Sequence, residues 1–193
     1  KIYGQRFLRK DVGVAIVVFV ALALGLLLRM QSTNRTTVFV DKDTSFSLAY
    51  PVTWGSTESL QTALLKVEDP QTDSAYKTNL SVESRDLDPA SPPTLQQLGD
   101  RRVAQRGALT AYHFLSNSPA MVGGAKAERI EYAFTAQPID QPRRASLPVV
   151  VHAVEYIVVG KASAFYIMIA APENEFAKAR AQMDQILQTV TVP

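Results

Sequence analysis

The hydrophobic pattern divides the chain into one long apolar segment and a longer region in which apolar and polar residues alternate. The apolar segment, Val12–Leu28, runs for seventeen residues without a charge or a strong hydrogen-bonding side chain. As a helix it would span about 25 Å, close to the bilayer's hydrocarbon thickness of about 30 Å. It is apolar on every side, longer than the core of a signal peptide, and followed by Arg29 rather than by a cleavage site. The pattern therefore predicts an uncleaved transmembrane helix at residues 12–30.

The charges around this anchor predict its orientation. Residues 1–11 hold four basic side chains and one acidic side chain, whereas only Arg29 and Arg35 follow the apolar segment closely. The positive-inside rule then keeps residues 1–11 in the cytoplasm. After a linker at 31–37, residues 38–193 are expected on the other side of a plasma or thylakoid-type membrane, as a periplasmic, extracellular or lumenal domain.

From Val38 onward the hydrophobic pattern has a period of two, which predicts β-strands. The expected strands are Val38–Val40, Phe46–Tyr50, Ala63–Val67, Leu80–Ser84, Leu109–Leu115, Ala127–Thr135, Val149–Val159 and Ala164–Ala170. The last two are the most apolar, so they are expected at the centre of the sheet.

One helix is predicted between these strands. Thr94 begins a capping-box sequence, which predicts a helix over 94–106. Arg101, Arg102 and Arg106 lie in its C-terminal half, where the helix dipole favours cations. We expect that favourable placement to explain the three arginines, and binding of an anionic partner is the alternative.

A second helix is predicted after Pro172, where apolar residues recur at steps of three and four. They are Phe176, Ala179, Met183, Ile186, Leu187 and Val190. This single stripe should cover one face of the sheet. A strand meander interrupted by only two helices predicts the α+β class, with one N-terminal transmembrane helix followed by an antiparallel β-sheet packed by helices.

The strand region also contains short motifs in a distinctive order. They are FSLAYP at 46–51 before Trp54, NLSV at 79–82, the helix at 94–106, the Gly123–Gly124 turn, and FYIM at 165–168 before the last helix. This order resembles PsbP-like domains, whose founding member is an extrinsic protein of photosystem II. The resemblance covers roughly 38–192. It implies an antiparallel sheet between helices in a protein that docks on the extracytoplasmic or lumenal side of a membrane. The chain departs from the founding member by having its own anchor, so a specific photosystem II role does not follow.

The charged residues and the absence of cysteine exclude several classes of function. Of 20 basic and 18 acidic residues, residues 1–30 hold five and one, which leaves 15 and 17 in the rest of the chain. That balance is not the footprint of a nucleic-acid-binding protein. Without cysteine, the domain has no disulfide, thiolate metal site or thiol nucleophile.

The remaining side chains give little sign of catalytic chemistry. His113 and His152 lie alone in predicted strands; they could meet across the sheet at a metal, but packing is the commoner role. Glu128, Glu131 and Glu155 fall on alternating strand positions, where a solvated sheet face is expected. No phosphate-binding loop or nucleophile elbow occurs. We therefore predict no catalytic, cofactor-binding or metal site, and no enzyme.

Two places are candidates for contact with a partner protein. Ala21 and Gly25 form a small-xxx-small pair that would let another transmembrane helix approach closely, although both could simply face lipid. The irregular loop Gln137–Pro148 carries Arg143 and Arg144, which could pair with carboxylates on a partner or remain solvated.

The anchor, the short linker and the domain without a catalytic motif together predict a non-catalytic, single-pass accessory or structural subunit of a membrane protein complex. The resemblance implies a photosynthetic or respiratory electron-transfer complex. The expected partners are membrane lipid and other transmembrane subunits, with no nucleic acid and no cofactor. The alternative is a free-standing, membrane-tethered binding or sensor domain for a small ligand or a metal.

Overall fold

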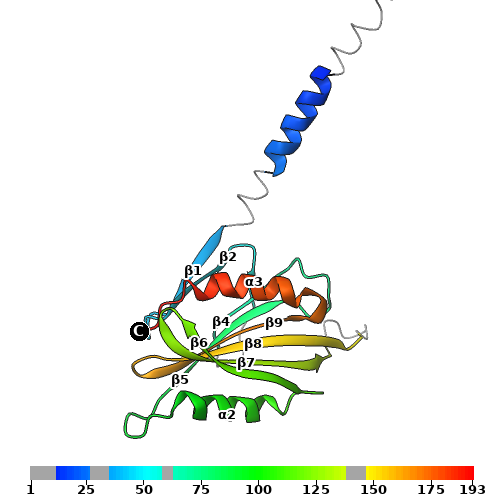
Figure 1. The fold of residues 1–193 in the computed structure, drawn as a ribbon. Coiled ribbons are helices and arrows are strands. Elements are labelled where there is room, and N and C mark those ends of the chain that lie inside the picture. The colour runs from blue at the N-terminus through cyan, green and yellow to red at the C-terminus, as the bar shows by residue number, and fades with distance from the viewer. Residues whose placement is uncertain (1–11, 27–34, 58–62, 138–146) are drawn as a thin grey trace, which may run out of the picture. The chain divides into compact units, whose positions relative to one another are not determined.

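The computed structural model describes residues 12–26, 35–57, 63–137 and 147–193, and the chain forms two compact units, Lys1–Thr36 and Thr37–Pro193. In the first unit, residues 12–26 form a helix (Figure 1). Within the described ranges, no helix is both long enough and apolar enough to span a membrane. The predicted anchor at 12–30 continues past this helix into residues that lie outside the described ranges.

The second unit is built on a seven-stranded sheet in which every pairing is antiparallel, in the order β3-β4-β5-β9-β8-β7-β6. Its strands are β3 (Gly55–Ser56), β4 (Ala63–Glu68), β5 (Asn79–Asp86), β6 (His113–Val122), β7 (Ala125–Ala136), β8 (Val149–Val159) and β9 (Ser163–Pro172). The two most apolar strands, β8 and β9, lie at the centre, which confirms the prediction made from their composition.

Layers of other elements cover both faces of this sheet (Figure 1). Helix α2 (Leu95–Arg106) packs on one face. The 3₁₀ turn η1 (Glu173–Glu175), helix α3 (Phe176–Leu187) and a two-stranded sheet of β1 (Thr36–Val40) and β2 (Ser47–Pro51) lie on the other. The domain is therefore an α+β sandwich with an antiparallel sheet between helices, as predicted.

The α3 face holds the larger apolar core. Phe176, Ala179, Met183, Ile186 and Leu187 are all buried there, which confirms the predicted stripe. The helix begins later than expected, because the chain first makes the 3₁₀ turn η1.

Strand β2 is tied to the residues that follow α3, although it lies near the start of the domain. Ser47 pairs with Thr191 as an isolated antiparallel bridge. The amide of Ala49 donates to the Thr189 hydroxyl at 2.9 Å, across 140 residues of sequence. These bonds join the beginning and the end of the domain.

The predicted strand Leu109–Leu115 is wrong in its position. Helix α2 ends at Gly107, the chain then turns through Ala111 with a φ of +50°, and β6 begins only at His113. Polar residues fill much of β6 because it is an edge strand with one side open to solvent, and this weakens the alternating pattern. The Gly123–Gly124 turn between β6 and β7 is present as predicted, and both glycines have the positive φ that a tight hairpin requires.

Candidate functional site

Helix α2 is fixed at its N-terminus by the capping box that its sequence predicts. The Thr94 hydroxyl accepts from the Gln97 amide at 3.2 Å, and the Gln97 side chain accepts from the Thr94 amide at 3.0 Å. In the helix that follows, Leu98, Arg102 and Arg106 are one turn apart and lie on the side toward the sheet. Two arginine side chains are therefore directed at the sheet rather than at solvent.

Arg102 is the centre of a buried ion-pair network. Its side chain is 3% exposed, and that of Glu155 in β8 is 0% exposed. The Arg102 Nε–H donates to Glu155 Oε1 at 2.6 Å. Its two terminal nitrogens donate to both carboxylate oxygens of Glu83 in β5, at 2.9 and 3.0 Å, and Nη1 also donates to Gln105. Every nitrogen of Arg102 thus has an acceptor.

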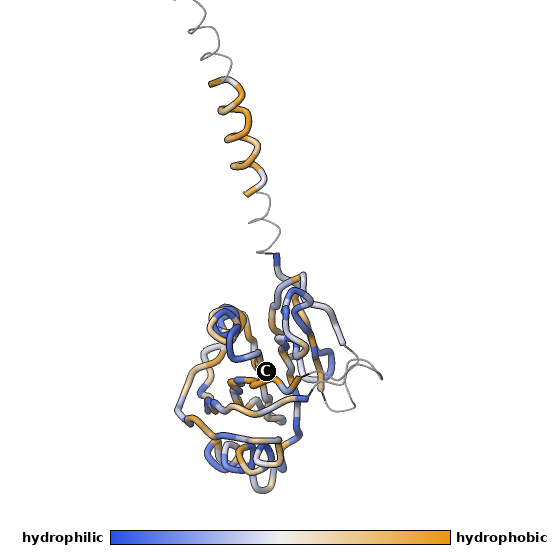
Figure 2. Tube along the Cα trace, turned by 90° about the vertical axis from the view of Figure 1, so that its right-hand side faces the viewer, coloured by the Kyte–Doolittle hydropathy of each residue, from blue (hydrophilic) through white to orange (hydrophobic). Residues whose placement is uncertain are grey.

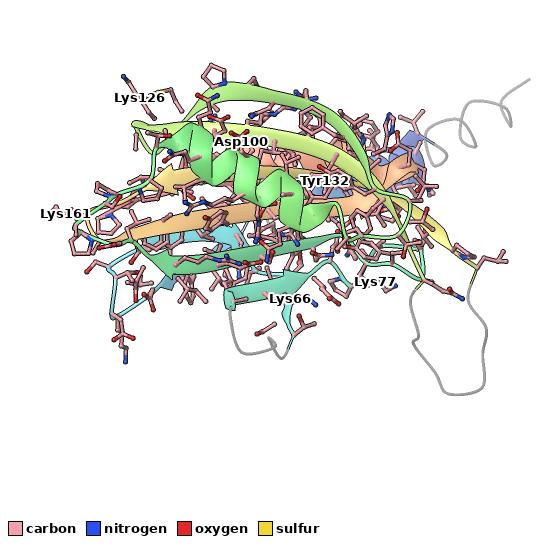
Figure 3. The ribbon with its side chains drawn as sticks, turned by 90° about the horizontal axis from the view of Figure 1, so that it is seen from below. Lys66, Lys77, Asp100, Lys126, Tyr132 and Lys161 are labelled. Carbon is pink, nitrogen blue, oxygen red and sulfur yellow. The ribbon has the colours of Figure 1, made fainter. Side chains whose placement is uncertain are left out.

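Arg106 extends this network toward β7. Its Nε and Nη2 atoms donate to the two Glu155 oxygens at 3.2 Å each. The Tyr132 hydroxyl is 3.2 Å from the Met168 sulfur and 3.4 Å from Glu155 Oε2. Figure 3 looks onto α2 and the sheet behind it, with Tyr132 beside the C-terminal half of the helix. The positive charges of two guanidinium groups therefore offset the negative charges of two carboxylates under α2.

Their surroundings shift the pKa values of Arg102, Glu83 and Tyr132 from the ordinary values. Burial opposes the charge of Arg102, but the Glu155 and Glu83 carboxylates outweigh it and hold the pKa of Arg102 above its ordinary value. Burial alone would raise the pKa of Glu83, but Arg102 and Arg106 lower it by a larger amount. The pKa of Glu83 therefore lies below its ordinary value of 4.5. Burial and the Glu155 charge raise the pKa of Tyr132, which stays a neutral donor. For Arg102, Glu83 and Tyr132 these shifts all lead away from neutral pH, whereas acid–base catalysis uses a group that is half-ionised near it.

The network corrects two expectations. We expected Arg102 and Arg106 to be placed for the helix dipole, and Glu155 to lie on a solvated sheet face. Instead, all three are buried or largely buried in one cluster. The missed signal was a single glutamate inside the otherwise apolar β8, together with two arginines, one and two turns after Leu98, on the same side of a helix.

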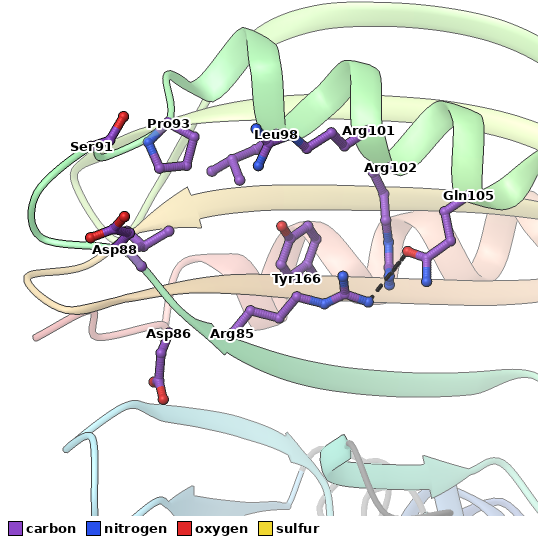
Figure 4. A pocket seen from close by; sticks show the side chains of 11 residues that line it. Arg85, Asp86, Asp88, Ser91, Pro93, Leu98, Arg101, Arg102, Gln105 and Tyr166 are labelled. Atoms are coloured by element: carbon purple, nitrogen blue, oxygen red, sulfur yellow. Dashed lines mark hydrogen bonds between the residues drawn. The ribbon is translucent and has the colours of Figure 1, made fainter.

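A cleft of about 520 Å³ opens beside the network, where the loop after β5 leads into α2. Figure 4 shows its lining, with Tyr166 of β9 at its base, Arg85 of β5 across from the helix, and Leu98 and Arg101 on α2. The guanidinium carbon of Arg102 lies 4.7 Å from the centre of the Tyr166 ring, and that of Arg85 lies 5.6 Å from it. The ring thus has two cations within reach of a cation–π interaction.

Comparison with known proteins identifies the fold around this cleft. No protein-family model matches the chain, and no curated protein sequence matches it. Among solved structures, cyanobacterial PsbP (CyanoP) from Synechocystis sp. PCC 6803 aligns with a TM-score of 0.60 and 11% identity, over 82% of this chain and 92% of its own. LpqN from Mycobacterium tuberculosis, involved in cell envelope biogenesis, gives 0.54 and 15%, over 82% and 91%. PA94 from Pseudomonas aeruginosa, a protein of unknown function, gives 0.53 and 11%, over 83% and 98%.

The domain has a PsbP-like fold. This confirms the resemblance found in the order of motifs. At identities of 11 to 15% the likeness concerns the fold. The charged network and cleft of this PsbP-like domain are therefore interpreted from its own residues.

On the α3 face of the PsbP-like domain, His152 lies between two carboxylates. Its Nδ1 is 3.1 Å from Glu173, and its Nε2 is 3.0 Å from Glu131, a contact with the distance but not the direction of a hydrogen bond. The imidazole stacks on Phe176 with ring centres 3.7 Å apart. The carboxylates sit at opposite ring nitrogens and share no common point for an ion. Across the described ranges, no group of three or more histidine, cysteine or acidic side chains is arranged to hold a metal.

The two histidines do not meet across the sheet. Strand register aligns His113 with Ala133 and Ala133 with His152, so β7 separates them. At the spacing of neighbouring strands this is about 10 Å between backbones. His113 is exposed on the edge strand, whereas His152 is largely buried under η1.

The predicted partner contacts remain predictions. Ala21 and Gly25 lie one turn apart on the helix at 12–26, and a Cβ atom built at Gly25 would meet no other atom within 4 Å. Arg143 and Arg144 lie outside the described residues.

Proposed function

We propose that this chain is a non-catalytic accessory or structural subunit of a membrane protein complex, anchored by one transmembrane helix at residues 12–30. Residues 1–11 would be cytoplasmic, and the PsbP-like domain would lie in the periplasm, the lumen or outside the cell. Its partners would be membrane lipid and the transmembrane subunits of the complex.

The observation that carries this proposal is the apolar surface of the helix at 12–26, which Figure 2 colours almost entirely as hydrophobic. Its ten large hydrophobic side chains are exposed, from 48% at Val20 to 73% at Phe19. Covering that surface with lipid or another helix is worth on the order of 10 kcal/mol. A surface of this kind on all sides of a helix is typical of a segment that sits in a membrane.

The structural neighbours support the setting of this role. One is a cyanobacterial PsbP, and another is involved in cell envelope biogenesis. A role in a photosynthesis-related or envelope assembly agrees with both, and an electron-transfer complex of a plasma or thylakoid-type membrane is the finer form of the proposal.

The saturated charges under α2 support a non-catalytic role. Arg102, Arg106, Glu83 and Glu155 bond to one another. A group that must exchange a proton with a substrate or attack it has to reach that substrate with a free hydrogen-bonding position, and the mutual bonds of this network occupy those positions.

Gentle detergent extraction followed by native electrophoresis tests the proposal. The chain should migrate with partners in a band well above its own 21.2 kDa. Gly25→Leu should reduce recovery of the partners while preserving membrane insertion, because leucine blocks close helix approach but is favourable in lipid. Migration as a lone species under every mild condition would contradict the subunit role.

A second test addresses orientation. Protease added to intact spheroplasts should digest the domain while residues 1–11 stay protected. Full protection of the domain would reverse the assignment.

The alternative, a free-standing membrane-tethered binding domain, is favoured by the cleft under α2. Unchanged partner recovery with Gly25→Leu, with Arg143→Ala/Arg144→Ala, and with both together would favour this alternative.

A further inference from the structure

We infer that the cleft under α2 binds a small organic anion in which one phosphate or carboxylate group is joined to an apolar ring. Arg85 and Arg101 would hold the anionic group, the Tyr166 hydroxyl would donate to it, and the apolar wall would receive the ring. This inference is independent of the accessory role, because a subunit and a free-standing domain could both carry such a site.

The first observation is an unpartnered hydroxyl at the base of the cleft. Tyr166 is only 5% exposed, and no residue in the described part of the chain forms a hydrogen bond with its hydroxyl. Figure 4 shows that hydroxyl directed toward α2 and Leu98. The hydroxyl oxygen itself is not sealed from solvent, so its donor is open to the cleft. A ligand oxygen in the cleft would supply the missing acceptor.

Burial raises the pKa of Tyr166, and the acidic residues nearby add to this while the arginines oppose it. The phenol therefore remains a neutral donor at physiological pH. Both Arg85 and Arg102 contact its ring, which restricts the direction of its hydroxyl.

The second observation is that two of the lining arginines have donors to spare. Arg85 is half-exposed, and its bonds are long, at 3.4 Å to Gln105 and 4.0 Å to Glu83. Arg101 is exposed and makes no hydrogen bond or ion pair with any described residue. Arg102, in contrast, has an acceptor at every nitrogen, so it positions Tyr166 and does not bind the ligand. Guanidinium groups with free, paired donors match the oxygens of carboxylates and phosphates.

The acidic side chains of the cleft are already engaged. Asp86 accepts from the Ser163 hydroxyl at 3.1 Å, and Figure 4 shows its carboxylate pointing away from α2. Asp88 accepts from the Ala90 amide at 2.9 Å within the loop. The negative charge of Asp88 at the loop end would repel a second anionic group there. The cleft therefore favours a ligand with one anionic group at its arginine end.

The third observation is the apolar part of the lining. Leu87, Pro93 and Leu98 line the cleft, and Figure 4 shows Leu98 on α2 next to Arg101. The cleft volume of about 520 Å³ is within the usual range for small-molecule sites. The combination of an apolar wall with a few convergent donors is typical of a site for an amphiphilic small molecule.

Calorimetric titration of the full chain in a non-ionic detergent with phenyl phosphate and with benzoate tests the inference. Inorganic phosphate alone and phenol alone serve as probes of the anionic group and of the ring. At least one of the two aromatic anions should bind about tenfold or more tightly than either of these probes, and about 1.4 kcal/mol corresponds to a factor of ten. The stronger of the two identifies the anionic group as phosphate or carboxylate.

Variants locate the binding in the cleft. Arg85→Ala/Arg101→Ala should weaken it about tenfold or more, because two charge-assisted contacts are lost. Tyr166→Phe, which keeps the ring beside Arg85 and Arg102, should weaken it by a smaller factor. Arg180→Ala is the matched control: this exposed arginine of α3 lies on the other face and should leave affinity within about twofold.

Three results would overturn the inference. They are no binding of either aromatic anion up to about 10 mM, affinity of both aromatic anions no greater than that of inorganic phosphate or phenol, and unchanged affinity in both Arg85→Ala/Arg101→Ala and Tyr166→Phe. Melting curves of each variant verify that the fold is retained. None of these results depends on partner recovery, so failure here is distinct from failure of the accessory role.

Discussion

The two faces of the central sheet are covered in different ways, although one helix packs on each. The α3 face buries a continuous apolar cluster, with Phe46 stacked on Phe165 at 4.6 Å between ring centres. The α2 face buries apolar residues around a core of two arginines and two glutamates. Apolar packing tolerates small shifts of a helix, whereas ion pairs require one alignment. The α2 face is therefore the more exactly positioned side, and the cleft lies on it.

The largest effect is expected from placing a charge in the apolar face. Ile186→Asp should lower the free energy of unfolding by several kcal/mol, because Ile186 is 4% exposed and the new carboxylate would have no partner. That loss rivals the total stability of a domain, about 5–15 kcal/mol. Thermal or chemical denaturation of the full chain in detergent measures it, and a melting temperature within a degree or two of wild type would contradict the assignment of this core.

Removing one member of the ion-pair network on the α2 face should lower the free energy of unfolding by less than Ile186→Asp does, but still by a large amount. Arg102→Met should lower the free energy of unfolding by about 3 kcal/mol, because Glu155 keeps only Arg106 as a buried partner. Adding Glu155→Gln should recover part of that loss, since Arg106 and Glu83 then remain as a balanced pair. A double-mutant cycle by denaturation measures the coupling, and simple additivity of the two losses would contradict a shared network.

Lowering the pH should destabilise the α2 face by a smaller amount than the substitutions above. Because the folded pKa of Glu83 lies below its ordinary value, its contribution is fully present above pH 4.5 and is lost as the pH falls through the folded pKa. The melting temperature of the wild type should therefore fall more between pH 5 and pH 3 than that of Glu83→Gln. Parallel curves for the two proteins would mean that Glu83 contributes no pH dependence.

The smallest effect is expected at Arg101, next to the buried Arg102. Arg101→Ala should change the free energy of unfolding by less than about 0.5 kcal/mol, because this exposed side chain has no partner among the described residues. The same denaturation measurement compares it directly with Arg102→Met. A loss as large as that of Arg102→Met would show that the helix is rotated from the described orientation.

Much of the fold could be predicted from the sequence because burial enforces a period. The apolar runs in β8 and β9 predicted the centre of the sheet, and the stripe of α3 predicted its inner side. Thr94 predicted the start of α2 within one residue, since a cap acts locally. The start of β6 was missed because a strand at an open edge has no such constraint on its outer side.

The candidate site was largely beyond sequence reasoning. Arg102 and Glu155 are 53 residues apart, and only the packing angle of α2 brings them within 2.6 Å. The sequence alone does not show whether an arginine side chain on a helix is solvated or buried. The glutamate inside an apolar strand was the one local signal, since a charge there demands a partner. Tyr166, in contrast, was part of an apolar strand with nothing in its sequence to mark its unpartnered hydroxyl.

The bonds between β2 and the residues after α3 also constrain the order in which the domain can form. Ala49 is made early in synthesis, but its partner Thr189 follows 140 residues later. Until that segment has emerged, β2 is paired with β1 alone and lacks its bonds to Thr189 and Thr191. Contacts so distant in sequence make closure slow. A chain that is translocated from its N-terminus would therefore complete its fold only when the segment beyond α3 arrives.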